Sequence, residues 1–157
     1  MNRRGFSLIE LMVVIAIIGT LLAIAVPRFT ETLKKSAIEG EVRELSLDLM
    51  QARATALTQR AATSVILTPV SYSGPGVSRT FKYPVTWQGK AAGDSQIKID
   101  FDERGSYDVT NNTNLAICVA PSVPDARVDS VVVFSLGNHL GKLTLGGTCD
   151  SGHITVQ

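Results

Sequence analysis

The chain has 157 residues, of which 45 % are hydrophobic and 18 % are charged, and its formal net charge is +1. This length allows one membrane anchor and one modest domain. A nearly neutral chain has no general electrostatic attraction to nucleic acid, so overall charge does not indicate a nucleic-acid-binding protein.

The first predicted element is an apolar helix near the N-terminus. Residues 6–26 form a run of 21 residues, which as a helix is about 31 Å long and matches the hydrocarbon core of a bilayer. Thirteen of these residues are Phe, Leu, Ile or Val, and Glu10 is the only ionisable side chain between Arg4 and Arg28. At about −0.3 to −0.6 kcal/mol each, the apolar residues outweigh one carboxylate, so we expect the segment to enter a membrane.

The flanking residues predict an orientation and oppose two alternatives. Arg3 and Arg4 precede the run, and the positive-inside tendency keeps them cytoplasmic while the C-terminal domain is exported. A secretory signal peptide has a shorter apolar run and a small-residue cleavage site, whereas Val26-Pro27-Arg28-Phe29 follows here. An ordinary single-pass anchor explains the length of the run. It does not explain Glu10, because a carboxylate inside a bilayer needs a partner.

The order Gly5-Phe6-Ser7-Leu8-Ile9-Glu10 before an apolar run resembles the class III signal of type IV prepilins and pseudopilins. The resemblance implies that residues 1–5 are a leader and that a prepilin peptidase cleaves between Gly5 and Phe6. It also implies that Phe6 is N-methylated. Residues 6–29 then stay in the mature protein as a transmembrane and assembly helix in contact with the lipid bilayer.

Processing of this kind gives Glu10 a role. Cleavage creates an ammonium group on Phe6, and methylation leaves that group cationic. A buried carboxylate and a buried ammonium each carry a desolvation cost unless they meet. In the family, the carboxylate pairs with the Phe ammonium of a neighbouring subunit. The resemblance therefore implies that other pilin or pseudopilin subunits and an inner-membrane assembly platform are partners.

Two residues of the apolar run are predicted to interrupt the helix. Gly19 lowers helix propensity, and Pro27 removes an internal hydrogen bond. A membrane helix tolerates both residues, which is one interpretation. The family suggests the other, in which this stretch unwinds inside a filament.

Residues 30–61 are predicted to form an amphipathic helix that continues from the membrane helix. One stripe with three- and four-residue spacing is expected to face the chain's own domain, and it comprises Ile38, Val42, Leu45, Leu49, Ala52 and Ala56. Leu47, Met50, Ala54 and Leu57 lie mostly on the opposite side. That second side either packs within the same globular domain or, as the family suggests, faces neighbouring subunits.

Residues 62–157 read as an antiparallel β domain because Val, Ile, Thr and aromatic residues alternate between turn-forming clusters. A hairpin turn is expected at Gly137-Asn138. One helix followed by many strands indicates an α+β fold with the long helix packed on the sheet. The resemblance to type IV pilins implies that this fold is pilin-like. The candidate strands are residues 63–68, 79–87, 96–101, 115–120, 128–136, 142–145 and 153–156.

A narrower resemblance lies at the end of the helix. Ala52-Arg53, Ala56 and Gln59-Arg60, followed by a β-rich segment, are similar to the GspH/FimT type of minor pilins and pseudopilins. The final hairpin region, residues 134–145, is also similar to the C-terminal region of that type. The resemblance implies a subunit of a type II secretion pseudopilus or a type IV pilus. Its domain would be periplasmic on the inner membrane, and periplasmic or extracellular in the filament.

The cysteines fit the exported location. A pair such as Cys118 and Cys149 forms one disulfide in an oxidising compartment, or remains as two thiols in a reducing one. Cys118 falls in a predicted strand and Cys149 in a turn, so a disulfide between them is expected to tie the last strand to the sheet.

No residue pattern indicates an enzyme, a cofactor or a metal site. His139 and His153 are the only histidines, and we interpret them as turn or strand residues. Residues 100–105 weakly resemble a calcium loop, but Arg104 and Asn111 are wrong for an EF-hand.

DNA capture on a filament is the alternative function. Some FimT-like proteins bind DNA through a basic C-terminal motif, which residues 152–157 lack. Phosphate contacts need clustered cations. The candidates Lys82, Lys90, Lys98, Arg104 and Lys142 are scattered along the sequence, so DNA is not an expected partner.

Overall fold

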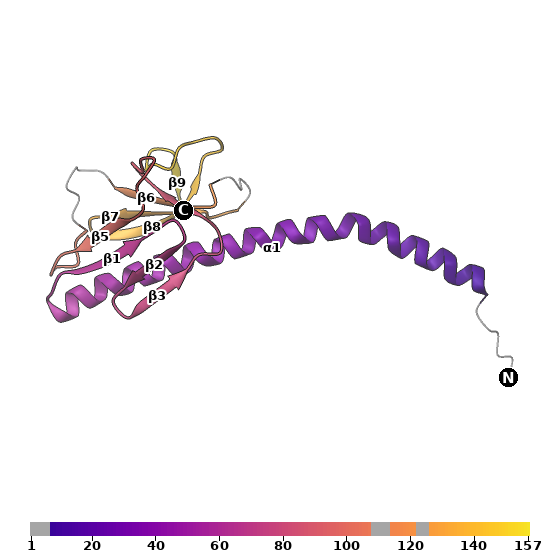
Figure 1. Ribbon diagram of the computed structural model, residues 1–157, viewed down its shortest axis with the longest axis horizontal. Helices are drawn as coiled ribbons and strands as arrows, with labels where there is room; N and C mark the ends of the chain where they lie inside the picture. Colours follow the sequence, from indigo (N-terminus) through magenta and orange to yellow (C-terminus); the bar gives the residue numbers. More distant parts are fainter. Residues whose placement is uncertain (1–6, 108–113, 122–125) are drawn as a thin grey trace. The chain divides into compact units, whose positions relative to one another are not determined.

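A computed structural model describes residues 7–107, 114–121 and 126–157. It contains helix α1 (Leu8–Gln59) and nine strands, β1 to β9, among these residues (Figure 1). The chain divides into two compact units, residues 1–34 and residues 35–157. The first unit holds the N-terminal part of α1, and the second holds the rest of α1 and all the strands.

Helix α1 passes through both residues that were expected to interrupt it. Gly19 and Pro27 lie inside the continuous helix. Nearby hydroxyls bond to helix carbonyls, Thr20 to the Ile17 oxygen and Thr30 to the Pro27 oxygen, each at 2.8 Å. The described helix therefore shows no break at these positions, and unwinding inside a filament stays a prediction.

The first sheet has four antiparallel strands in the order β3-β2-β1-β5. Its strands are β1 (Thr63–Leu67), β2 (Ser71–Gly74), β3 (Val77–Thr80) and β5 (Ile97–Phe101). The prediction of one strand over residues 79–87 was wrong, because β3 ends at Thr80 and β4 (Val85–Trp87) belongs to the other sheet. Pro84 precedes β4 and has no amide hydrogen to donate, which favours a break at this point.

The second sheet has five antiparallel strands in the order β4-β6-β7-β8-β9. Beside β4 it contains β6 (Leu115–Val119), β7 (Ser130–Phe134), β8 (Gly137–Leu143) and β9 (Ile154–Val156). The predicted hairpin exists, but its turn is Ser135-Leu136 and not Gly137-Asn138, which begin β8. Cross-strand pairing of Phe134 with Gly137 places the turn two residues earlier than expected.

The core of the second unit lies between α1 and the two sheets. The six residues of the predicted helix stripe, Ile38 to Ala56, are all buried, each at most 1 % exposed. They join one cluster with residues of both sheets, including Val65, Ile99 and Val131. At about 1.5–3 kcal/mol for each fully buried aliphatic side chain, this contact holds helix and sheets together. The α+β fold with a long helix packed on antiparallel sheets is confirmed.

Candidate functional site

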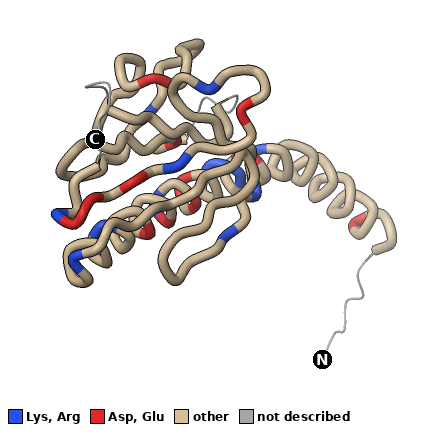
Figure 2. Tube along the Cα trace, turned by 60° about the vertical axis from the view of Figure 1, so that its left-hand side comes forward, with Lys and Arg blue, Asp and Glu red and all other residues tan. Residues whose placement is uncertain are grey.

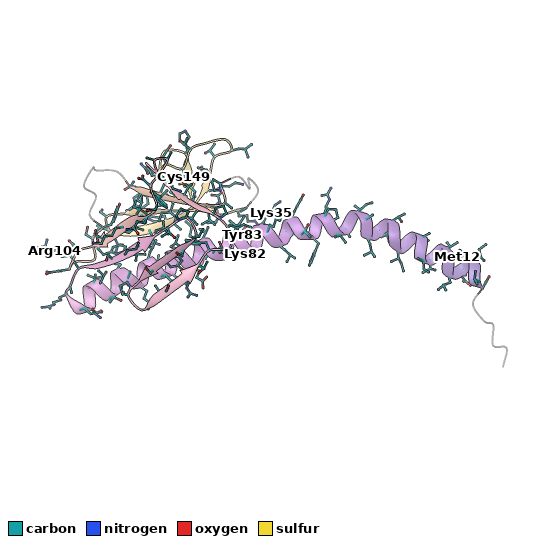
Figure 3. All side chains as sticks on the ribbon, in the orientation of Figure 1. Met12, Lys35, Lys82, Tyr83, Arg104 and Cys149 are labelled. Atoms are coloured by element: carbon teal, nitrogen blue, oxygen red, sulfur yellow. A yellow bond between two sulfur atoms is a disulfide. The ribbon has the colours of Figure 1, made fainter. Side chains whose placement is uncertain are left out.

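The N-terminal part of α1 is apolar and uncovered. No described residue from Ser7 to Lys34 is buried, and side chains such as Met12 project away from the helix (Figure 3). Among the described residues, α1 is the one helix that is long and apolar enough to cross a membrane. Water is an unfavourable environment for so many exposed Leu, Ile and Val side chains, so this surface requires lipid or protein around it.

Glu10 lies in the first turn of this apolar helix. Up to Arg28 it is the only charged position of α1, and Figure 2 shows one acidic turn on an otherwise uncharged segment. The helix N-terminus attracts negative charge, because its first amide hydrogens lack helix partners. The processing residues Gly5 and Phe6 lie outside the described residues.

A second exposed apolar surface runs along α1 beside its buried stripe. Leu47, Met50 and Leu57 are 64 %, 47 % and 49 % exposed, and Ala54 between them is also exposed. The interpretation that both sides of the helix pack within one domain is therefore wrong for the described chain. This side remains open to another molecule.

A groove of about 330 Å³ lies between this side of α1 and strand β8. Leu47 and Met50 of α1 and Leu140 of β8 give it apolar walls. Arg43, Ser46, Asn138, His139 and Gln157 complete the lining. The groove therefore combines apolar surface with one permanent positive charge, at Arg43.

Arg53 ties α1 to the ends of both sheets. Its Nε donates to the Gly105 carbonyl at 2.6 Å, and its Nη2 donates to the Ser135 carbonyl at 2.7 Å. Gly105 belongs to the turn after β5 in the first sheet, and Ser135 belongs to the β7–β8 turn of the second. The guanidinium also lies 5.7 Å from the centre of the Phe101 ring. Burial lowers the pKa of Arg53, and the Asp102 carboxylate opposes that shift.

A second polar tie joins α1 to the β2–β3 hairpin. Asp48 Oδ2 accepts a hydrogen bond from the Tyr72 hydroxyl at 2.5 Å and another from Arg79 Nε at 2.8 Å. Arg79 Nη1 also contacts Glu44 at 2.6 Å. Burial and the bond to Asp48 raise the pKa of the Tyr72 phenol. The bond to Asp48 is the main cause of the raised pKa of Arg79.

Strand β8 is attached to the helix through Asn138. Its Nδ2 donates to the Ser46 carbonyl at 3.0 Å and to the Ser46 hydroxyl at 2.5 Å. The contact fixes the separation of the two walls of the groove. A Cβ added at Gly137, next to it, would lie 3.7 Å from Arg53 Nη1, which is an ordinary van der Waals contact.

The structure joins Cys118 and Cys149 in the expected disulfide. Cys118 lies in β6, and Cys149 lies in the loop between β8 and β9. In the same loop Asp150 accepts from the Thr148 hydroxyl at 2.7 Å and contacts His153 Nδ1 at 2.6 Å. The Thr148 bond, with help from His153, lowers the pKa of Asp150 to about 2. His153 lies in the loop just before β9, so the predicted strand over residues 153–156 begins one residue later than expected.

The residues considered for other chemistry have local contacts. His139 packs edge-on against Phe134 in the β7–β8 hairpin, with 5.1 Å between ring centres. In the turn that weakly resembled a calcium loop, the Asp102 carboxylate is used within the turn itself, because its Oδ1 accepts from the amides of Arg104 and Ser106. Within the described part of the chain no three His, Cys, Asp or Glu residues could hold a metal together.

The basic residues that were considered as DNA contacts lie on different structural elements. Lys98 of β5 pairs with Asp100 at 2.8 Å, and Lys142 lies on β8 in the other sheet. Lys82 and Lys90 lie over the rings of Tyr83 and Trp87, at 5.9 and 4.9 Å. Figure 2 shows basic residues interspersed with acidic ones over the second unit.

Residues 1–26 match the family of the prokaryotic N-terminal methylation motif. A fimbrial protein of Pseudomonas aeruginosa is 28 % identical over 111 residues, which cover 68 % of this chain and 66 % of that protein. The type IV major alpha-pilin of Moraxella bovis is 39 % identical over 69 residues, or 40 % of this chain and 43 % of that pilin.

The type IV narrow pilus major component PilA5 of Thermus thermophilus is 46 % identical over 59 residues, which cover 38 % of this chain and 50 % of that protein. The chain thus spans about two thirds of the length of the Pseudomonas relative and half or less of the other two. No solved structure matches it. The methylation motif and the fimbrial relatives together support a type IV pilin.

Proposed function

We propose that this chain is a structural subunit of a pilin-like filament and not an enzyme. It is anchored in the inner membrane through residues 6–29 and assembles through α1. The observation that carries the proposal is Glu10, a single carboxylate on the uncovered apolar part of α1. A carboxylate there is unfavourable in an isolated membrane helix and favourable only beside a cation.

In this proposal the cation beside Glu10 is the ammonium group of Phe6 on a neighbouring subunit. A prepilin peptidase removes residues 1–5 and leaves a methylated amine on Phe6. Phe6 and Glu10 are four residues apart, about one helical turn, so pairing between copies sets their axial offset. The methylation motif over residues 1–26 supports this processing.

The narrower assignment is a minor subunit of the GspH/FimT type, in a type II secretion pseudopilus or a type IV pilus. It rests on Ala52-Arg53, Ala56 and Gln59-Arg60. Arg53 gives this pattern a physical meaning, because it ties the helix to the turns of both sheets. The remaining partners are an inner-membrane assembly platform and the sibling subunits. The domain is exported, and its disulfide fits an oxidising compartment.

The test replaces Glu10 with Ala in the full-length chain and compares it with Glu31→Ala, an exposed acidic residue of the same helix. Both variants are expected to insert into membranes, as judged by carbonate extraction. Glu10→Ala is expected to be lost from sheared filaments, whereas Glu31→Ala is retained. Normal recovery of Glu10→Ala in filaments refutes the role of Glu10. Mass spectrometry of the mature N-terminus checks the processing separately, with methylated Phe6 as the expected first residue.

A further inference from the structure

Arg43 is a lone charge on the exposed apolar side of the second unit. It precedes Leu47, Met50, Ala54 and Leu57 at spacings of four, three, four and three residues, and all five are exposed. Arg43, Leu47 and Met50 line the groove beside β8. Among the described residues, Arg43 forms no ion pair. The groove therefore presents a cation that lacks a carboxylate, next to apolar surface that lacks a cover.

The N-terminal part of α1 carries the opposite charge in the same pattern. Glu10 is followed by Val14, Ile17, Leu21 and Ile24, again at spacings of four, three, four and three residues. All five are exposed, and Glu10 is the only charged side chain of this stretch. Alternating spacings of four and three place side chains on one seam where parallel helices pack together.

The two seams match when one helix is shifted along the other by 33 residues, the interval from position 10 to position 43. In that register Glu10 meets Arg43, Val14 meets Leu47 and Ile17 meets Met50. The next pairs are Leu21 with Ala54 and Ile24 with Leu57. A parallel direction is required, because all copies enter the membrane in the same orientation.

We propose that the α1–β8 groove receives the N-terminal helix of a second copy in this register, with Arg43 bonded to Glu10 of that copy. The inference rests on the proposed function. When a subunit leaves the bilayer for a filament, its apolar helix loses its lipid cover and needs protein instead. The groove walls supply that cover, and Arg43 compensates the carboxylate that enters with the helix.

The contact is compatible with pairing between Glu10 and a Phe6 ammonium. A carboxylate has two oxygens and about four acceptor sites, so it accepts from both cations. Arg43 is also exposed at the groove and keeps part of its hydration. Arg43 accordingly selects the register between copies. Its contacts show no contribution to the fold of the described chain.

Cysteine cross-linking tests the register in filaments of the full-length chain. Val14→Cys combined with Leu47→Cys is expected to give an intermolecular disulfide on mild oxidation. The matched control, Val14→Cys with Ala54→Cys, lies on the same seam but one heptad away. Seven residues correspond to about 10 Å, too far for a disulfide. Mass mapping identifies the bonds and separates them from any exchange with Cys118 or Cys149.

Charge substitutions at Arg43 provide an independent test of the proposed contact. Arg43→Lys is expected to keep filament yield, whereas Arg43→Glu is expected to lower it about tenfold or more, because two carboxylates then face each other. Unfolding of both variants is expected to match the unchanged chain. The inference is overturned if filaments form but the control pair cross-links as well as the test pair, or if Arg43→Glu assembles normally. If the unchanged chain never enters a filament, the proposed function fails and this inference with it.

Discussion

Replacing Arg53 with Met is expected to loosen the attachment of α1 to both sheets. Methionine keeps most of the apolar stem but removes the donors to Gly105 and Ser135, at 2.6 and 2.7 Å. A hydrogen bond from a charged donor contributes about 1.5–3 kcal/mol when buried, and less where water competes. Because Arg53 is only partly buried, we expect a loss of about 2–3 kcal/mol for the two bonds and the Phe101 contact together.

The assay is urea unfolding of the full-length chain in detergent, followed by the fluorescence of Trp87. This is the only tryptophan and is 4 % exposed, so its emission reports on the core of the second unit. With a slope of about 1–3 kcal/mol per molar urea, the midpoint should fall by about 1–2 M. Arg43→Met is the matched control, and it should change stability by less than about 0.5 kcal/mol. Equal midpoints for the two variants would refute the assignment of Arg53 as the tie.

Two further predictions concern stability. Replacing Cys118 and Cys149 with Ser opens a cross-link with a sequence separation of 31 and should cost about 3.5 kcal/mol in the same assay; an unchanged midpoint contradicts this. Burial raises the pKa of Asp129 above its ordinary 3.8, and a bond from the Leu143 amide only partly offsets it. The folded state thus binds the Asp129 proton more tightly than the unfolded state does. The stability that this protonation adds is complete below pH 3.8 and is lost as the pH rises through the raised pKa. Asp129→Asn should remove that pH dependence, and parallel stability–pH curves would show the reasoning to be wrong.

The local residue pattern was sufficient to predict the helix and to separate its buried side from its exposed side. Apolar residues at three- and four-residue spacing identified the buried stripe, because burial in a helix follows its period of 3.6. The same spacing marked Leu47, Met50 and Leu57 as a separate side. Whether the chain's own sheets cover that side depends on tertiary packing, so the sequence left two interpretations. The exposure of these residues removed one of them.

Local pattern was insufficient where the chain changes sheet. Residues 79–87 have the composition of one strand, yet they contribute to β3 and β4 in different sheets. β-propensity describes how well a residue fits a half-buried surface and contains no information about which strand lies beside it. The short β2 was missed for a different reason, since its Ser and Gly residues are typical of a turn.

The sequence alone determined the membrane-compatible helix, the isolated Glu10 and the helical stripe, because each depends on residues within a few helical turns. Only the tertiary structure decided the polar ties of Arg53, Asp48 and Asn138. Their partners are 24 to 92 residues away in the chain. Such contacts depend on how strands are ordered in the sheets, and strand order is set by the packing of the whole core rather than by any one segment.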